Sequence, residues 1–253
     1  MSLGWNSLAA DTLYAYMGAG APVEEIAFYE RRIRENGGLA LDQACGTGRH
    51  IFPLLERGLE VHGADVSADA LRLARRAAEG AGVLATLFEQ RMEDCDIPHR
   101  YGTIYVANGT FQVVSDRQDA QRTLARFWRH LSSGGQLLIE LFVPDLTEVG
   151  NRVYWEPVPR RDAEGSIATT LWDEDVDAYE QVLLSRRRYD LLVDGNCVRS
   201  EDHAHLLRWY HKYEFFMMLE RAGFEDLATF SDYTDEPATS ESATVVYAGR
   251  RPT

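Results

Sequence analysis

This chain of 253 residues contains few cysteines, no long apolar run and no basic segment near its start. Its three cysteines (Cys45, Cys95 and Cys197) are scattered and odd in number, which favours a reducing cytoplasm over a disulfide framework or a metal site. No stretch of about eighteen apolar residues occurs, so no membrane span is expected. A secretory signal is not expected either, because no basic segment precedes an apolar one at the N-terminus. We therefore expect a cytoplasmic protein.

Positive charge is also scarce. The chain has 26 Lys and Arg against 40 Asp and Glu, a formal net charge of -14 at pH 7. Nucleic-acid binding requires a positive face that displaces counterions, so we expect no nucleic-acid partner, and anionic membranes are disfavoured as well. An acidic protein favours neutral or cationic small substrates such as amines. Arg186-Arg187-Arg188 is a local basic run, which we interpret as part of a solvated strand.

The most informative segment begins with the apolar run Leu39-Ala40-Leu41, which ends in Asp42 and turns through small residues that include Gly46 and Gly48. The run predicts a buried parallel strand, and the glycines allow the backbone to approach a ligand closely. About twenty residues later, a second apolar run ends in Asp65, where a carboxylate can accept both hydroxyls of a ribose. Together, these features predict a nucleoside-binding unit.

The residues around the glycines indicate which nucleoside is bound. A dinucleotide fingerprint requires a third glycine, but Ile51 occupies that place. Asp42 would repel a pyrophosphate and attract the cationic amino group of a methionine moiety. The electrostatics therefore favour S-adenosylmethionine over NAD.

The same segment resembles the first motif of the class I, Rossmann-like methyltransferases, an acid and a spacer followed by G-x-G-x-G, with Ala44 at the place of the first glycine. The resemblance implies S-adenosylmethionine as the cofactor. It also implies that Asp42 and the backbone around Ala44, Gly46 and Gly48 hold the methionine part, and that Asp65 binds the ribose.

Further cofactor contacts follow from the resemblance. Val66 and Met92, with Glu93 beside it, would pack against or bind the adenine. Many relatives have an Asp just before that methionine, where this chain has Arg91, so we assign adenine recognition to backbone groups at Met92 and Glu93. Asn108, at the end of the fourth strand, is expected to reach the methionine part or the methyl group.

Strand-like and helix-like segments alternate through the first two thirds of the chain, which predicts an α/β fold with a mostly parallel sheet and helices on both faces. The resemblance implies seven strands. We expect an N-terminal helical cap over residues 1–36 and a Rossmann-like domain over 37–150 and 210–253. Residues 151–209 lose the helical period, and Asp194-Gly195-Asn196 is a hairpin signal, so this segment predicts an antiparallel β insertion that covers the substrate site.

The expected substrate contacts come from segments that would cover the cofactor. They are Tyr16, Phe111, Gln112, Phe142, Arg208 and Tyr210. The candidate catalytic residues are His211, as a base near the strand ends, and Tyr14. His203 and His205 flank Ala204 on a predicted strand, so both should face the same way, but no third metal ligand is suggested and we expect no metal.

The leading hypothesis is an S-adenosylmethionine-dependent methyltransferase that acts on a small molecule at nitrogen or oxygen by in-line methyl transfer, which requires mainly proximity and orientation. The alternatives are a non-catalytic S-adenosylmethionine-binding protein and an NAD-dependent oxidoreductase. The expected partner is a small-molecule methyl acceptor, and the sequence indicates no oligomeric state.

Overall fold

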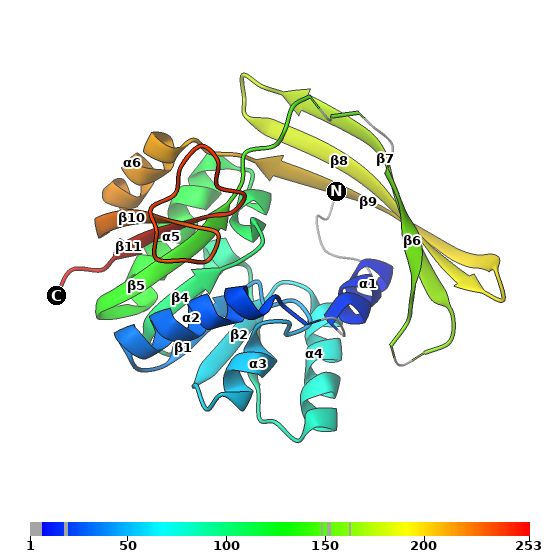
Figure 1. Cartoon of the computed structure of the whole chain (residues 1–253), viewed down its shortest axis with the longest axis horizontal. Coiled ribbons are helices and arrows are strands. Elements are labelled where there is room, and N and C mark those ends of the chain that lie inside the picture. The colour runs from blue at the N-terminus through cyan, green and yellow to red at the C-terminus, as the bar shows by residue number, and fades with distance from the viewer. Residues whose placement is uncertain (1–6, 18–19, 148, 151–152, 162) are drawn as a thin grey trace.

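The computed structural model describes residues 7–17, 20–147, 149–150, 153–161 and 163–253. The chain builds two sheets, one inside a layered α/β unit and one that extends away from it (Figure 1). No helix of the described segments is both long and apolar enough to span a bilayer.

The larger sheet has seven strands in the order β10-β11-β5-β4-β1-β2-β3. The strands are β1 (Ala40–Gln43), β2 (Val61–Asp65), β3 (Thr86–Glu89), β4 (Tyr101–Val106), β5 (Leu131–Leu141), β10 (Glu225–Ser231) and β11 (Val245–Arg250). β1 to β5 are mutually parallel, and β11 runs antiparallel to both of its neighbours. The strand order reverses between β1 and β4, and parallel α/β sheets bind ligands at the carboxyl ends of the strands at such a point.

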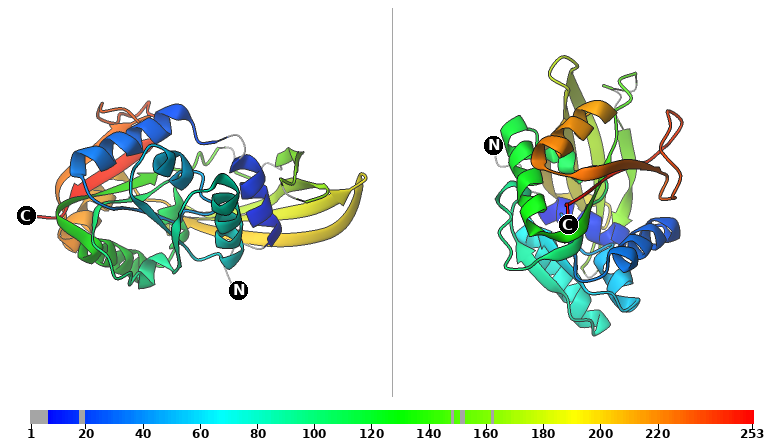
Figure 2. Two further views of the ribbon diagram at one scale, coloured as in Figure 1. Left: turned by 90° about the horizontal axis from the view of Figure 1, so that it is seen from below. Right: turned by 90° about the vertical axis from the view of Figure 1, so that its left-hand side faces the viewer.

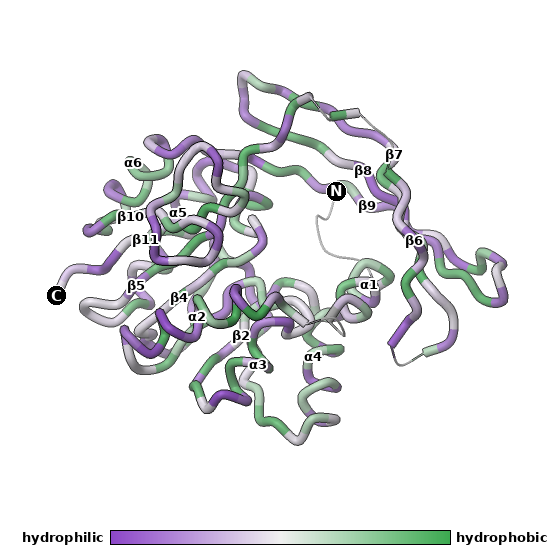
Figure 3. Tube along the Cα trace, in the orientation of Figure 1, coloured by the Kyte–Doolittle hydropathy of each residue, from purple (hydrophilic) through white to green (hydrophobic). Residues whose placement is uncertain are grey.

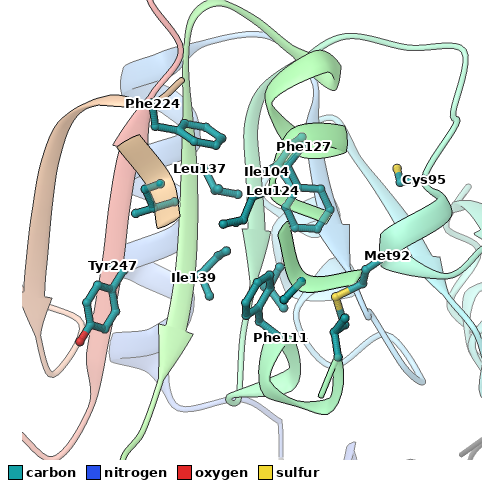
Figure 4. Close-up of a cluster of buried hydrophobic side chains, with 14 of the residues drawn as sticks. Met92, Cys95, Ile104, Phe111, Leu124, Phe127, Leu137, Ile139, Phe224 and Tyr247 are labelled. Atoms are coloured by element: carbon teal, nitrogen blue, oxygen red, sulfur yellow. The ribbon is translucent and has the colours of Figure 1, made fainter. Parts of the chain in front are cut away.

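Helices cover both faces of this sheet (Figure 2). One face carries α2 (Val23–Asn36), α3 (Ile51–Glu56) and α4 (Ala68–Ala81). The other carries α5 (Arg117–His130) and α6 (Lys212–Ala222), with the short 3-10 helices η1 (Met92–Asp94) and η2 (Thr110–Val113) nearby. In Figure 4, Phe111, Phe127 and Ile139 belong to the core on the α5 and α6 side. The predicted fold class is confirmed.

Local sequence explains where these helices begin and end. The Ser67 side chain accepts a hydrogen bond from the Ala70 amide (3.1 Å), and Gly82 ends α4 in a left-handed conformation. Asp116 caps α5 in the same way. β5 begins at Leu131, which pairs with Tyr101 before the register shifts.

The second sheet is the predicted insertion. Its strands are β6 (Val153–Pro159), β7 (Ser166–Asp177), β8 (Val182–Val193) and β9 (Asn196–Arg208), antiparallel and in sequence order. Asp194 and Gly195 both have positive φ (50° and 76°), as a two-residue hairpin turn requires. Figure 3 shows both hydrophilic and hydrophobic stretches along these strands, and buried Leu183 and Ser185 of β8 alternate with partly exposed neighbours, as in a sheet with one covered face.

The helix α1 (Ser7–Met17) lies between the two units (Figures 1 and 2). Its residues Ala10 and Tyr14 pack against α4, while Leu8 and Ala9 pack against Ile167 and Tyr189 of the second sheet. α2, by contrast, belongs to the helix layer of the larger sheet. The segment expected as one N-terminal cap therefore consists of two helices with different neighbours, and its residues 1–6 lie outside the described part.

Candidate functional site

The turn after β1 is tied to the neighbouring strand. The amides of Ala44 and Cys45 both donate to the carbonyl of Ala64, at 2.7 and 3.0 Å. Ala44, Gly46 and Gly48 all have positive φ, at 65°, 54° and 95°. A Cβ at Gly48 would lie 2.2 Å from the Phe52 ring, so this position requires glycine on steric and conformational grounds.

Asp42 ends β1 as a buried acid that is only 1% exposed. Its Oδ2 atom has no hydrogen-bond partner among the described residues. Burial raises the pKa of Asp42 to about 6, although His50 and the Tyr105 hydroxyl act to lower it. A buried carboxylate that lacks a partner is costly, and a cationic group of a ligand would relieve that cost. The amino group of S-adenosylmethionine fits this requirement.

Asp65 ends β2 and holds the glycine turn from the other side. Its Oδ2 accepts a hydrogen bond from the Gly46 amide and its Oδ1 accepts one from the Ser67 amide, both at 2.8 Å. Burial raises the pKa of Asp65, and these two hydrogen bonds limit the rise. Both acids therefore flank one turn at adjacent strand ends, as the spacing predicts.

A cavity of about 380 Å³ opens at these strand ends, and we call it the strand-tip cavity. Its walls include five of the expected cofactor residues, Ala44, Asp65, Val66, Met92 and Glu93. Arg91 pairs with the Glu93 carboxylate. Residues 203–206 of β9 also line the cavity, so the inserted sheet forms part of its wall.

His203 and His205 face the same way, as predicted, and their ring centroids are 4.1 Å apart. Burial lowers the pKa of both, that of His205 to about 3, and the nearby Arg187 adds to both effects. Both imidazoles are therefore neutral at physiological pH.

Asn108 lies at the end of β4 with a left-handed backbone (φ 56°). Its backbone N–H donates to Glu140 Oε2 at 2.9 Å, and its side-chain oxygen accepts a hydrogen bond from Arg49 at 3.0 Å. Arg49 also pairs with the buried Glu25, which lies 2.7 Å from the His50 ring nitrogen. Sequence reasoning missed this polar network, because it joins α2, the glycine turn and two strands across long separations.

A second cavity of about 260 Å³ lies between α1 and the inserted sheet, and we call it the α1 cavity. Its lining residues are Ala9, Thr12, Leu13, Tyr16, Trp155, Thr169, Arg187 and Tyr189. A Cβ built on Gly46 would lie 4.0 Å from the Leu13 side chain, so α1 passes directly over the glycine turn. Leu13 therefore connects the α1 cavity with the predicted methionine end of the cofactor site.

The structure brings one expected substrate residue, Tyr16, to the α1 cavity, where its side chain is partly exposed. Phe111 and Tyr210 are instead core residues, and both rings contact Phe215 of α6. Their apolar surface is used for packing, so neither is available to a ligand in this structure.

The other expected substrate residues tie loops together. The Gln112 side chain is fully buried, and it exchanges two hydrogen bonds with the Phe142 backbone. The Phe142 ring lies over Gly109, where an added Cβ would be 2.5 Å away. Arg208 donates to the carbonyls of Ser115 and Glu180. These contacts give Gln112, Phe142 and Arg208 structural roles, and none of these three residues lines either cavity.

Neither expected catalytic residue lines a cavity. His211 is exposed and precedes α6, where it forms a capping box with Glu214. Tyr14 is buried between α1 and α4, with Arg161 over its ring. Sequence reasoning missed three residues at the α1 cavity, Trp155, Arg187 and Tyr189. They share one face of the inserted sheet, and the alternation of side chains along a strand is the signal that could have grouped them.

Comparison with known proteins agrees with this geometry. Residues 40–135 match a family model described as a methyltransferase domain. A glycine/sarcosine N-methyltransferase of Halorhodospira halochloris is 33% identical over 116 residues, which are 45% of this chain and 43% of that protein.

Solved structures share the fold over nearly the whole chain. An S-adenosylmethionine-dependent methyltransferase from Clostridium acetobutylicum superposes with a TM-score of 0.78 at 16% identity, covering 96% of this chain and 97% of the other. A sugar N-methyltransferase from Streptoalloteichus sp. gives a TM-score of 0.76 at 20% identity, covering 96% and 92%. None of these matches favours the NAD-dependent alternative. Residues 40–135 are accordingly a methyltransferase domain, and the chain as a whole has the fold of S-adenosylmethionine-dependent methyltransferases.

Proposed function

We propose that this enzyme methylates the nitrogen of a small amine that binds in the α1 cavity. The observation that carries the proposal is the position of Leu13, which lines the α1 cavity and lies 4.0 Å from a Cβ built on Gly46. An acceptor beside Leu13 would be next to the methionine end of the cofactor site, while the strand-tip cavity would hold the adenosine end.

For the cofactor we propose the roles that the resemblance implies. Asp42 would pair with the amino group, because its Oδ2 is buried without a partner among the described residues. The backbone at Ala44, Gly46 and Gly48 would contact the methionine part, with Asn108 nearby. Asp65 would accept the ribose hydroxyls, and Val66, Met92 and Glu93 would contact adenine.

The bound sulfonium supplies an activated methyl group with a good leaving group, so the chain needs mainly to hold the acceptor nitrogen in line with it. An amine attacks through a neutral lone pair and loses its proton afterwards, so no strong base is required at the attacking atom. Neither base candidate, His211 or Tyr14, lines a cavity. Nitrogen is therefore favoured over oxygen, in agreement with the N-methyltransferase name of the 33% identical relative.

The volume of the α1 cavity and the charge of the protein support a small acceptor. The α1 cavity of about 260 Å³ is close to the lower end of the range for small-molecule sites. The net charge of -14 disfavours a nucleic-acid acceptor.

The test has two parts. Calorimetry with S-adenosylhomocysteine should show binding by the wild type and weaker binding by Asp65→Ala. A panel of small amines, each matched with its hydroxyl analogue, is then assayed for S-adenosylhomocysteine release. We expect turnover of at least one amine and none of its hydroxyl partner; turnover confined to hydroxyl compounds would contradict the assignment to nitrogen.

A further inference from the structure

The three consecutive arginines of β8 separate onto its two faces. Arg186 pairs with Asp173 and Asp175, and Arg188 forms a two-pronged pair with Asp202 at 2.8 and 3.0 Å. Neighbouring residues of a strand point to opposite faces. Arg187 accordingly faces the other way, toward the α1 cavity that it lines. The solvated-strand interpretation therefore describes Arg186 and Arg188 but not Arg187.

The described residues that line the α1 cavity around Arg187 include aromatic rings but no acid. Its guanidinium lies 5.6 Å from the centre of the Trp155 ring. Burial raises the pKa of Tyr189, and the Arg187 guanidinium acts to lower it. Its Nε atom is buried and has no hydrogen-bond partner, and no carboxylate lies within ion-pair distance of it, among the residues that the structure describes. Such a cation is unusual in a chain with 40 acidic residues.

The titratable groups of β9 on the same face as Arg187 are His203, His205 and Glu201, and the Glu201 carboxylate is taken up by Arg199 and by hydrogen bonds from Ser7 and Leu8. His203 pairs with Arg187 across the strands, and His205 lies beside it on the same face. Because both pKa values are lowered, these rings carry no charge that could compete for an anion or neutralise the arginine. The wall of the α1 cavity thus presents one positive charge among Tyr16, Trp155 and Tyr189.

We propose that Arg187 binds an anionic oxygen group, a carboxylate or a phosphate, on the acceptor, whose amine then points toward Leu13 and the glycine turn. The proposal rests on the proposed function, since it names the acceptor class of that same cavity. The planar guanidinium can donate two parallel hydrogen bonds to such a group, which fixes orientation as well as position. The aromatic walls would contact the body of the acceptor.

The first experiment measures binding without turnover. Protein saturated with S-adenosylhomocysteine is titrated with 4-aminobenzoate, its uncharged counterpart 4-aminobenzamide, and phenyl phosphate. We expect the wild type to bind at least one anion more tightly than the amide, and Arg187→Gln to lose about 10- to 100-fold of that affinity, as expected when a charged hydrogen bond is removed. The tighter of the two anions identifies carboxylate or phosphate as the preferred group.

Matched controls lie on the same strand. Arg186→Gln and Arg188→Gln remove the same charge from the opposite face, so both should bind the anions as the wild type does. Arg187→Lys keeps the charge but loses the planar guanidinium that can donate two parallel hydrogen bonds. Its affinity for the anions should therefore fall between those of the wild type and Arg187→Gln. An unchanged affinity for S-adenosylhomocysteine shows that each variant is folded.

Two results would overturn the inference. One is equal binding of the amide and both anions by the wild type, and the other is equal binding of the anions by wild type and Arg187→Gln.

The second experiment repeats the amine assay with acceptors that do and do not carry a carboxylate. The expected effect of Arg187→Gln is a raised KM for the anionic acceptors alone. If no amine is methylated but Arg187-dependent anion binding persists, the proposed function fails and the anion site stands. If neutral amines are methylated and Arg187→Gln has no effect on anion binding, the proposed function stands and the anion site at Arg187 fails.

Discussion

Replacing Asp42 with Asn should stabilise the ligand-free protein and weaken its binding of cofactor. Burial raises the pKa of Asp42 from 3.8 to about 6 in the folded state. At 1.36 kcal/mol per pH unit, ionised Asp42 therefore costs the folded state about 3 kcal/mol. The Asn amide carries no charge, so the variant avoids this cost.

The sign of the effect fixes the pH window. Between pH 3.8 and about 6 the folded protein binds more protons at Asp42 than the unfolded chain, so this group makes stability fall as pH rises through that interval. The cost is absent below the window and complete above it. The advantage of Asp42→Asn should therefore be close to zero at about pH 4 and should reach about 3 kcal/mol, roughly 6–12 °C in Tm, at about pH 8.

Urea or thermal unfolding at the two pH values measures the difference. Asp65→Asn is the matched control, because both Asp65 oxygens already accept backbone hydrogen bonds and an amide replaces one acceptor with a donor. That variant should lose stability. The reasoning is refuted if Asp42→Asn is less stable than the wild type at about pH 8, or if its advantage does not depend on pH.

The same charge should control the ligand. Calorimetry with S-adenosylhomocysteine should show wild-type affinity increasing as pH rises through about 6, because ionised Asp42 is the form that pairs with an ammonium. Asp42→Asn should bind about 10- to 100-fold more weakly at neutral pH and lose that pH dependence. An affinity equal to that of the wild type would exclude Asp42 as the partner of the amino group.

Three further variants test the local geometry by equilibrium unfolding. Gly48→Ala should lose about 2–4 kcal/mol, since its Cβ would lie 2.2 Å from the Phe52 ring at a φ of 95°, and a loss under about 1 kcal/mol would contradict the clash. Glu25→Gln should lose about 2–3 kcal/mol at neutral pH. Burial alone would raise the pKa of Glu25, but His50 and Arg49 bring it below 4.5. The stability loss of Glu25→Gln should therefore disappear as pH falls below 4.5. A loss that does not depend on pH would contradict the ion pairs. Ala44→Gly should gain about 0.5–1 kcal/mol by relieving its left-handed backbone, whereas a loss would show that the turn tolerates alanine.

The placement of the proposed cofactor residues at adjacent strand ends could be predicted because it is local in sequence. Asp42, Gly46 and Asp65 lie within one strand–turn–helix–strand unit, and parallel strands place their carboxyl ends at one edge. The hairpin at Asp194-Gly195 was predictable for the same reason, since a short turn has its own residue preferences.

The residues around the α1 cavity could not be predicted in the same way. His211 and Tyr210 follow the inserted sheet closely in sequence, but the chain passes there to the α5 and α6 face, where Tyr210 is buried in the core. Trp155 and Arg187 come together only because three strands pair and dock on α1, more than a hundred residues away in the chain. Whether Arg187 faces a cavity or solvent depends on the register of that pairing, which no local pattern specifies.

The residues of the α1 cavity come from α1 and the inserted strands, and neither of the two cores that pack against the seven-stranded sheet includes a residue from those segments. Under the proposed function, changes at Tyr16, Trp155 or Arg187 would therefore redirect acceptor choice without disturbing the packing that forms the cofactor domain. In an evolving lineage, a scaffold divided in this manner can acquire new methyl acceptors by substitution in one sheet and one helix while its cofactor chemistry is inherited unaltered.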